Sequence, residues 1–336
     1  MDHQRKSLRM GAAVIAGVIL LRLFSRGAFA PLVQALTRPE TVAVLLYLET
    51  GRVVRPYAPL TYPAESAIPE WSEAPPQPSV PTFTPEDLSL LDLDNETDYD
   101  PDLADLVARP LRWDLTQDQP TVLILHTHGT ESYTPSPGED YPESGDYRTL
   151  DDGYNMISIG ELVANRLENA GISVIHDRAF HDYPSYNGSY SNARQSMETI
   201  LAEHPGICLV LDLHRDAAAT VNGQMDTSAT VNGRESAQLM IVVGTDDGGL
   251  YHPNWQDNLS LALKLQLQLE KLHPGLCRPV NLCAERFNGD ESPGALLIEV
   301  GAAGNTRPEA ILAASALADG IIALARGANL TEDSTS

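Results

Sequence analysis

Histidine and glutamate residues stand at three places in this 336-residue chain where an apolar run ends. The first is the segment 126–131, which reads His-Thr-His-Gly-Thr-Glu; the second contains His214 and the third contains Glu299. Imidazole and carboxylate groups are suitable zinc ligands, and a catalytic zinc site uses three protein ligands and leaves the fourth position to water. The sequence therefore predicts a Zn²⁺ site formed by His128, Glu131 and His214.

His126 is the alternative to His128 as a zinc ligand. The two histidines are two residues apart, so on a strand they would share a face. We choose His128 because only this residue has the H-x-x-E spacing of carboxypeptidase-like zinc enzymes relative to Glu131.

Glu299 then remains available as a catalytic base. A carboxylate beside a metal can take the proton from an attacking water and return it to the leaving amine. The residues that flank Glu299 are apolar and give it no local cation, which favours a functional carboxylate over a salt-bridged core residue. Arg215, which follows a predicted ligand, is predicted to polarise a carbonyl or to bind a substrate carboxylate.

Short apolar runs alternate with longer amphipathic segments after Pro120, a pattern typical of strands separated by helices. The predicted strands are 121–125, 172–175, 207–213, 238–243 and 295–300, and the predicted helices are 155–169, 190–202, 258–272 and 308–326. The predicted fold is α/β, with a mixed central sheet flanked by helices. Functional groups in such folds collect past the carboxyl ends of the strands, where the histidines and glutamates stand.

A local duplication lies between two of the predicted strands. Residues 219–223 and 229–233 both read Ala-Thr-Val-Asn-Gly. Asn-Gly is a strong signal for a tight hairpin turn, so two such turns ten residues apart predict a small hairpin excursion. The duplication is too short to define the fold.

The charge of the chain limits its partners. It has 22 Lys and Arg residues against 46 Asp and Glu residues, a formal net charge of −24. A strongly anionic surface repels phosphate, which excludes a generic nucleic-acid binder. Three cysteines are too few for a disulfide framework, although the sequence leaves open whether Cys277 and Cys283 pair.

The N-terminal residues 1–30 are predicted to be a membrane anchor or a signal peptide. Basic residues at positions 5, 6 and 9 precede an uncharged run from 10 to 21, and apolar residues resume after Arg22. The run is shorter than the roughly 20 residues of a membrane span unless Arg22 snorkels to the interface. A signal peptide would be cleaved after the Ala-Phe-Ala of residues 28–30. Both alternatives place the rest of the chain outside the cytoplasmic membrane.

Residues 31–118 are predicted to be a mostly disordered, acidic and proline-rich tether. No Lys or Arg stands between positions 56 and 108, and 10 prolines fall between 56 and 101. Such a stretch buries too little apolar surface to offset its ordering entropy. Its carboxylates lack the glycine and the spacing of a calcium loop. The catalytic domain is predicted over 119–328, followed by a disordered tail over 329–336.

Three segments of the predicted domain carry a family resemblance. They are 125–133, which begins Leu-His-Thr-His; 181–190, which reads His-Asp-Tyr-Pro-Ser-Tyr-Asn-Gly-Ser-Tyr; and 211–217, which reads Leu-Asp-Leu-His-Arg-Asp-Ala. They resemble the signature segments of the stage II sporulation protein P family, membrane-anchored cell-wall hydrolases of endospore-forming bacteria. That family is similar in fold to zinc-dependent N-acetylmuramoyl-L-alanine amidases, which have a three-layer sandwich. The likeness covers 121–326, whereas the N-terminal third resembles the family only in its arrangement of anchor and tether.

The resemblance implies an amidase that cuts the bond between N-acetylmuramic acid and the L-alanine of the stem peptide. His128 and His214 match the family's metal-binding histidines, and Glu299 with Asn305 after it matches the catalytic glutamate. In the wider amidase superfamily the ligating glutamate lies nearer the first helix, where this chain has Glu143 and Asp152. The H-x-x-E spacing supports Glu131 independently of the family.

The resemblance also implies partners and a location. The expected partners are peptidoglycan, a sporulation lytic transglycosylase that cleaves the denuded glycan, and a membrane protein that localises the pair during forespore engulfment. The expected location is the cell membrane, with the catalytic domain on the outer side, or secretion if the signal is cleaved. A peptide-cleaving side activity is known for the family, but no residue here indicates it.

The segment 181–190 has two interpretations. Its Tyr, Asn, Ser and Gly content suits a loop that contacts sugar and peptide, with His181, Tyr186 and Asn187 as the predicted substrate-binding residues. Alternatively, it is an ordered turn into the next helix, with Ser189 or Ser191 as the N-cap.

Two other functions share the same residues. A zinc carboxypeptidase- or endopeptidase-type enzyme acting on wall peptides would need a pocket for a terminal carboxylate, for which Arg215 is the obvious candidate. A non-catalytic wall-binding module would be expected to have lost at least one of His128, His214 and Glu299. All three are present.

Overall fold

The computed structural model describes residues 83–328, apart from 85, 112–113, 116, 140, 142–145 and 221–222. The predicted anchor over 1–30, the tether before residue 83 and the tail over 329–336 lie outside these residues.

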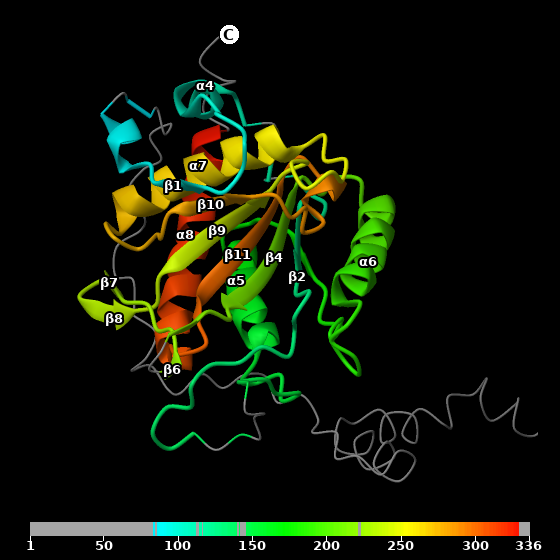
Figure 1. Cartoon of the computed structure of the whole chain (residues 1–336), viewed down its shortest axis with the longest axis vertical. Helices are drawn as coiled ribbons and strands as arrows, with labels where there is room; N and C mark the ends of the chain where they lie inside the picture. The colour runs from blue at the N-terminus through cyan, green and yellow to red at the C-terminus, as the bar shows by residue number, and fades with distance from the viewer. Residues whose placement is uncertain are drawn as a thin grey trace, which may run out of the picture. The chain divides into compact units, whose positions relative to one another are not determined.

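A seven-stranded mixed sheet forms the centre of the described domain (Figure 1). Its strands, in spatial order, are β1 (Leu93–Asn95), β10 (Val280–Cys283), β9 (Leu239–Gly244), β11 (Ala295–Ala302), β4 (Leu209–Asp216), β2 (Val122–Leu125) and β3 (Val174–His176). The β9–β11 pair is antiparallel, and the other neighbours in this sheet are parallel. The predicted mixed α/β fold is confirmed.

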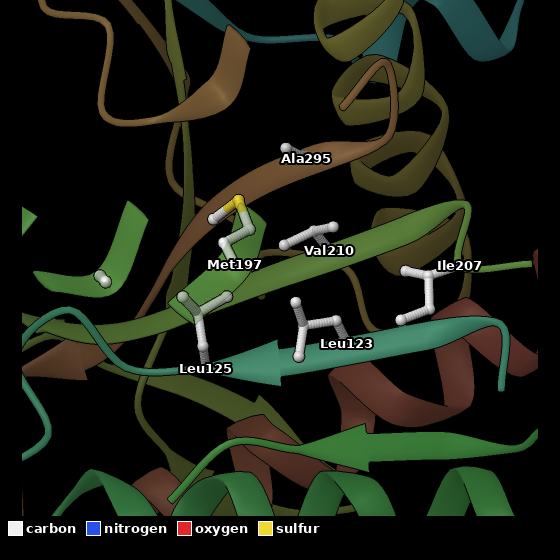
Figure 2. Packing of buried hydrophobic residues seen from close by; sticks show 7 residues of the cluster. Leu123, Leu125, Met197, Ile207, Val210 and Ala295 are labelled. Atoms are coloured by element: carbon white, nitrogen blue, oxygen red, sulfur yellow. The ribbon is translucent and has the colours of Figure 1, made fainter. Parts of the chain in front are cut away.

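Helices cover both faces of this sheet. They are α4 (Leu103–Ala108), α5 (Met156–Asn169), α6 (Ser189–Glu203), α7 (Trp255–Leu272) and α8 (Arg307–Ala328), with short 3-10 helices η1 (Asp87–Leu90) and η2 (Gly289–Glu291). Helix α8 packs against α5 and α7 and contacts β11. Helix α6 lies on the opposite face, where Ala193 and Met197 cover apolar side chains of β2, β4 and β11 (Figure 2). The five predicted strands and four predicted helices are all present, with ends shifted by at most three residues.

Helix α8 owes its apolar composition to its central place in the domain. Residues Arg307–Gly327 are long and apolar enough to cross a membrane by length and composition, but 72% of the apolar window is buried inside the domain. Small side chains such as Ala313, Ala314 and Ala316 are fully buried, which lets neighbouring elements approach closely. This helix is therefore a core element of the fold.

The end of the predicted tether is wrong, because residues from about 83 onward belong to the fold. Strand β1 pairs in parallel with β10 and forms one edge of the sheet. Helix α4 packs on α7 and buries Leu106 and Val107, and Asp102 caps its N-terminus by accepting from the Asp105 N–H. The apolar residues of this acidic stretch therefore reach the core, while several carboxylates act as caps or surface ion partners.

Removing residues 83–109 should destabilise the domain strongly. The burial of Leu106 and Val107 alone is worth about 3 to 6 kcal/mol, since a fully buried Leu or Val side chain contributes about 1.5 to 3 kcal/mol. Urea unfolding of a chain that begins at residue 83 and of one that begins at Pro110 measures the difference. Equal free energies of unfolding would show that β1 and α4 contribute nothing to the packing.

A buried lysine fixes α4 to α7. Lys264 is 4% exposed, and its ammonium group donates to the Leu106 carbonyl at 2.9 Å and to the Ser260 hydroxyl at 2.7 Å. Burial lowers the pKa of Lys264 to about 8, with a smaller contribution from Arg109. Between about pH 8 and pH 10.5 the folded state binds fewer protons at Lys264 than the unfolded state does. The contribution of Lys264 to stability therefore rises as the pH increases through this range.

Lys264→Met should remove this pH dependence. The free energy of unfolding of the wild type should rise by about 2 kcal/mol relative to that of Lys264→Met between pH 7 and pH 10, as the pKa difference implies. The control is Lys271→Met, at a more exposed lysine of the same helix that pairs with Asp87 at 3.0 Å. Parallel stability curves for the wild type and Lys264→Met would contradict the assignment.

Two hairpins occupy the duplicated segments between β4 and β9. They are β5 (Ala219–Thr220) with β6 (Gly223–Gln224), and β7 (Ala229–Val231) with β8 (Arg234–Ser236). Asn232 and Gly233 have φ of 52° and 74°, as a two-residue Asn-Gly turn requires. The predicted hairpin excursion is confirmed. The turn residues 221 and 222 of the first copy lie outside the described residues.

Candidate active site

The carboxyl ends of β2, β4 and β11 meet at one edge of the sheet, because these neighbouring strands are parallel. The register pairs Glu299 of β11 with His214 of β4, and Leu125 of β2 with Asp212 of β4. Asp212 and His214 are two residues apart, so both project to the same face as Val210, which packs under α6. The candidate site therefore lies on the α6 face of the sheet.

His128 and His214 lie against each other at this edge. Their ring centroids are 5.3 Å apart and their planes are nearly perpendicular, at 89°. The two residues are 6% and 3% exposed, and the Nδ1 atom of His128 is buried without a hydrogen-bond partner. The structure thus brings together the two predicted histidine ligands.

His126 points to the other side of the sheet. Its Nδ1 donates to the Leu213 carbonyl at 3.0 Å, and its Nε2 lies 2.9 Å from Nε2 of His176. Gly160 of α5 passes so close that a Cβ there would lie 2.5 Å from the His126 ring. Burial lowers the pKa of His126 to about 3. The expectation that His126 and His128 share a face is wrong, because β2 ends at Leu125 and the chain turns over residues 127–130.

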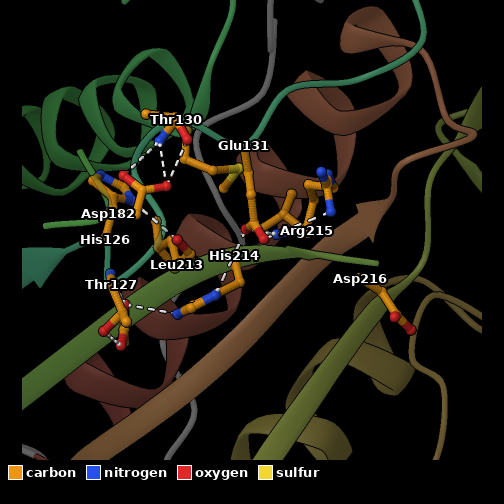
Figure 3. A network of polar contacts seen from close by, with 12 residues as sticks. His126, Thr127, Thr130, Glu131, Asp182, Leu213, His214, Arg215 and Asp216 are labelled. Carbon is orange, nitrogen blue, oxygen red and sulfur yellow. Dashed lines mark hydrogen bonds and ion pairs between the residues drawn. The ribbon is translucent and has the colours of Figure 1, made fainter. Parts of the chain in front are cut away.

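Glu131 reaches the His214 ring from the opposite side to Thr127 (Figure 3). Its Oε2 lies 3.7 Å from Nδ1 of His214 and accepts from the Arg215 backbone N–H at 3.2 Å. Its Oε1 pairs with the Arg148 guanidinium at 3.2 Å. The Glu131 backbone accepts from the Met156 N–H at 2.9 Å, which places this glutamate beside the first turn of α5.

The two alternative acidic ligands have different positions. Glu143 lies outside the described residues. Asp152 pairs with Arg178 at 3.1 Å, and its side chain is 54% exposed. Among the described candidates, Glu131 is the carboxylate that contacts His214.

Glu299 places a second carboxylate in the same buried space. Its Oε2 atom is buried without a hydrogen-bond partner. Burial raises the pKa of Glu299 to about 8; the neighbouring His214 acts against this rise and the charge of Glu131 adds to it. A carboxyl group with a pKa near neutrality is suited to exchange protons in catalysis.

Arg215 lies behind Glu131 and is only 2% exposed. Its Nε donates to the Ser132 carbonyl at 3.0 Å, and its Nη2 donates to the carbonyls of Asp146 and Tyr147 at 3.1 Å. The guanidinium therefore holds the loop that carries Glu131. Arg215 was predicted to contact the substrate, but its guanidinium is buried and contacts these backbone carbonyls instead.

Tyr186 covers the outer side of His128. The two rings stack with centroids 4.6 Å apart at an angle of 8°, and the Arg148 guanidinium lies 4.8 Å from the Tyr186 ring centre. Tyr186 is 56% exposed, and Asn187 beside it is also exposed. Of the predicted substrate-binding residues, these two stand at the open side of the site.

His181 is not part of the His128 cluster. Its Nε2 lies 3.1 Å from Oδ2 of Asp177, which also accepts from the Ser196 hydroxyl. The predicted serine caps are also wrong: α6 begins at Ser189, its N-cap is Gly188 with φ of 93°, and no side chain caps it. Glycine adopts a left-handed backbone conformation without steric cost, which explains the glycine in the Asn-Gly-Ser sequence at this position.

Sequence reasoning missed two residues of the site, the buried Asp212 and the partly buried Tyr190. Asp212 lies 2.9 Å from Nε2 of His214; burial opposes protonation of this histidine, but the charge of Asp212 prevails and the pKa of His214 rises to about 10. Tyr190 meets the His128 ring edge-on at 5.6 Å, and burial raises the pKa of its hydroxyl above the usual range, with further contributions from Asp212 and Glu299. The alternation of Asp212 and His214 on one strand was a usable signal for Asp212, whereas Tyr190 depends on tertiary packing.

The donor set fits a zinc ion. Within the described part of the chain, no three of the His, Cys, Asp and Glu side chains already surround one point at ligating distance. However, His128 Nδ1 and His214 Nε2 are buried atoms with no hydrogen-bond partner, and His214 Nδ1 faces Glu131 Oε2 in the same cluster. Two imidazoles and one carboxylate, with a second carboxylate nearby, are the groups that a hydrolytic zinc site uses.

Comparisons with known proteins find a sporulation protein among the relatives of this chain. It is 30% identical over 216 residues to stage II sporulation protein P of Bacillus subtilis, which covers 61% of this chain and 51% of the relative. The chain thus spans about half the length of that curated relative.

Solved structures similar to this chain include two amidases. One is the N-acetylmuramoyl-L-alanine amidase AmiC2 of Nostoc punctiforme, at 15% identity and a TM-score of 0.34 over 60% of this chain and 94% of the other. Another is an N-acetylmuramoyl-L-alanine amidase from Clostridium difficile 630, at 19% identity and a TM-score of 0.36 over 66% and 100%.

The sequence model of the family described as "Stage II sporulation protein P (SpoIIP)" matches residues 63–322. This range includes all the site residues described above. This match covers well over half of the chain, and the chain therefore belongs to the stage II sporulation protein P family.

Proposed function

We propose that this protein is a zinc-dependent N-acetylmuramoyl-L-alanine amidase that releases stem peptides from peptidoglycan during endospore formation. The observation that carries the proposal is the buried cluster of His128, Glu131, His214 and Glu299 at the carboxyl ends of neighbouring strands. Membership of the sporulation family supports the cellular setting.

His128, Glu131 and His214 are proposed to hold the metal. Glu299 is proposed to transfer the proton. A zinc ion at this place would polarise the scissile carbonyl and lower the pKa of water. Glu299 accepts a proton from the attacking water and delivers it to the amide nitrogen as the C–N bond breaks. Its Oε2 atom is buried, which limits competition from bulk water for that proton.

Tyr186 and Asn187 are proposed to contact the substrate. Both are exposed at the open side of His128, and Tyr186 presents an aromatic ring that can pack against a sugar or a peptide. Arg148 is paired with Glu131 and Asp182, so its charge already has partners within the protein.

The geometry favours the amidase over its alternatives. A carboxypeptidase-type enzyme needs a free cation for a terminal carboxylate, but Arg215 is buried and donates to backbone carbonyls. A non-catalytic wall-binding module would not need Glu299 with its buried oxygen beside His214.

The cellular context is part of the proposal. We expect the N-terminal segment to hold the protein at the cell membrane with its catalytic domain on the outer side. A lytic transglycosylase would cleave the glycan from which peptides have been removed, and a membrane-bound sporulation protein would localise both enzymes to the septal wall during engulfment.

Mass spectrometry of digested peptidoglycan tests the proposed bond. The expected products are stem peptides with a free L-alanine amine and glycan strands without peptides. Fragments cut within the stem peptide would indicate the peptidase instead. Intact peptidoglycan after incubation with zinc-loaded protein would indicate the non-catalytic module.

A further inference from the structure

Asp212 connects the two segments that carry the candidate histidine ligands. Its side chain is 5% exposed and lies on β4, two residues before His214. Oδ1 accepts from the Thr127 N–H at 2.8 Å, and Oδ2 accepts from the Thr127 hydroxyl at 2.6 Å. Oδ1 also lies 2.9 Å from Nε2 of His214. One carboxylate thus contacts both the turn that carries His128 and the ring of His214.

We infer that Asp212 is a positioning residue that selects the ring nitrogen of His214 presented to the metal and fixes the turn before His128. The inference rests on the proposed function, because it assumes that both histidines are ligands.

The choice of nitrogen follows from the two sides of the His214 ring. Nε2 is held beside Asp212, whereas Nδ1 faces Glu131 Oε2 at 3.7 Å. Nε2 of His214 has no hydrogen-bond partner, so its contact with the Asp212 oxygen is electrostatic and not an aligned hydrogen bond. The negative charge of Asp212 nevertheless favours a proton on Nε2, which leaves Nδ1 to share an ion with Glu131.

The effect on His128 acts through the backbone. Two short bonds from Thr127 to Asp212 hold the first residue of the turn that follows β2. The unpartnered Nδ1 of His128 is therefore aimed by the same carboxylate that orients His214. Partners of metal-ligating histidines typically change metal affinity or activity by about 10- to 100-fold when removed.

Zinc affinity of Asp212→Asn tests this role. Asn keeps the size and one oxygen acceptor but not the charge, and we expect the zinc dissociation constant, measured by chelator competition, to rise by about 10- to 100-fold. The matched control is Asp177→Asn, which changes a carboxylate that holds His181 and the Ser196 hydroxyl outside the cluster. The control should leave zinc affinity unchanged. Wild-type affinity in Asp212→Asn would overturn the inference.

Proton–nitrogen correlation spectra of the histidine rings give an independent readout in the wild type. On addition of zinc, Nδ1 of His214 should lose its proton while Nε2 keeps it. Binding through Nε2 would overturn the inference even if Asp212→Asn did not fold. A wild type that binds no zinc would instead refute the proposed function. The ring spectrum of the zinc-free protein would still show whether Nε2 of His214 carries a proton beside Asp212. A deprotonated Nε2 would contradict the role of Asp212.

Discussion

Glu299→Gln should bind zinc and peptidoglycan as the wild type does and lose about 10²- to 10⁴-fold in turnover, the usual contribution of a positioned base. Glutamine keeps the shape and the hydrogen-bonding reach of the side chain but cannot accept the proton. The loss should fall on kcat more than on KM, because the interaction that is removed develops in the transition state. Steady-state kinetics of amine release, with zinc content measured on the same samples, checks both parts.

A control for this substitution is Glu198→Gln, at an exposed glutamate that pairs with Arg194 on α6. It should keep wild-type turnover. Loss of zinc from Glu299→Gln would make Glu299 a ligand and would require Glu131 to be reconsidered as the base. Near-normal turnover would refute the mechanism.

His214→Ala should lose both zinc and activity, because it removes the ring that lies between Glu131 and Asp212. It also removes the imidazole beside the buried Asp212 carboxylate, which keeps the two hydrogen bonds from Thr127. His214→Gln, which retains a polar side chain of similar size, provides a second variant for the metal measurement. Circular dichroism establishes that the variants are folded, and elemental analysis measures zinc per chain. Full zinc occupancy in a folded His214 variant would refute the ligand assignment.

The two neighbouring histidines provide an internal comparison for this experiment. His128→Ala should lose zinc, since its ring lies against that of His214 and its Nδ1 is buried without a hydrogen-bond partner. His126→Ala should retain zinc, since its ring nitrogens contact Leu213 and His176. The opposite result would show that the wrong member of the pair was chosen.

Local patterns were sufficient to predict the central strands and the main helices. The run that became β2 is continuously apolar and those that became β4 and β11 are mostly apolar, because these strands are largely buried on both faces. Strand β1 and helix α4 were missed because the acidic, proline-rich composition around them outweighs three or four apolar residues. Their stability comes from partners distant in sequence, such as β10 and Lys264.

The sequence predicted which residue types form the site but not where their side chains point. Strand periodicity suggested a shared face for His126 and His128, but β2 ends before both, and the turn reverses the direction of the second side chain. Adjacency to a ligand suggested a substrate role for Arg215, although alternation along β4 places Arg215 and His214 on opposite faces. Whether a buried charge faces substrate or backbone depends on loops that the local sequence does not determine.

Zinc titration of the chelator-stripped protein tests the central claim most directly. Peptidoglycan is incubated with stripped protein at increasing zinc, and release of L-alanine amines is followed together with bound metal. The account predicts that stripped protein is inactive and that amine release saturates at about one zinc per chain. Cleavage that is unaffected by stripping, or zinc binding without release of L-alanine amines, would contradict it.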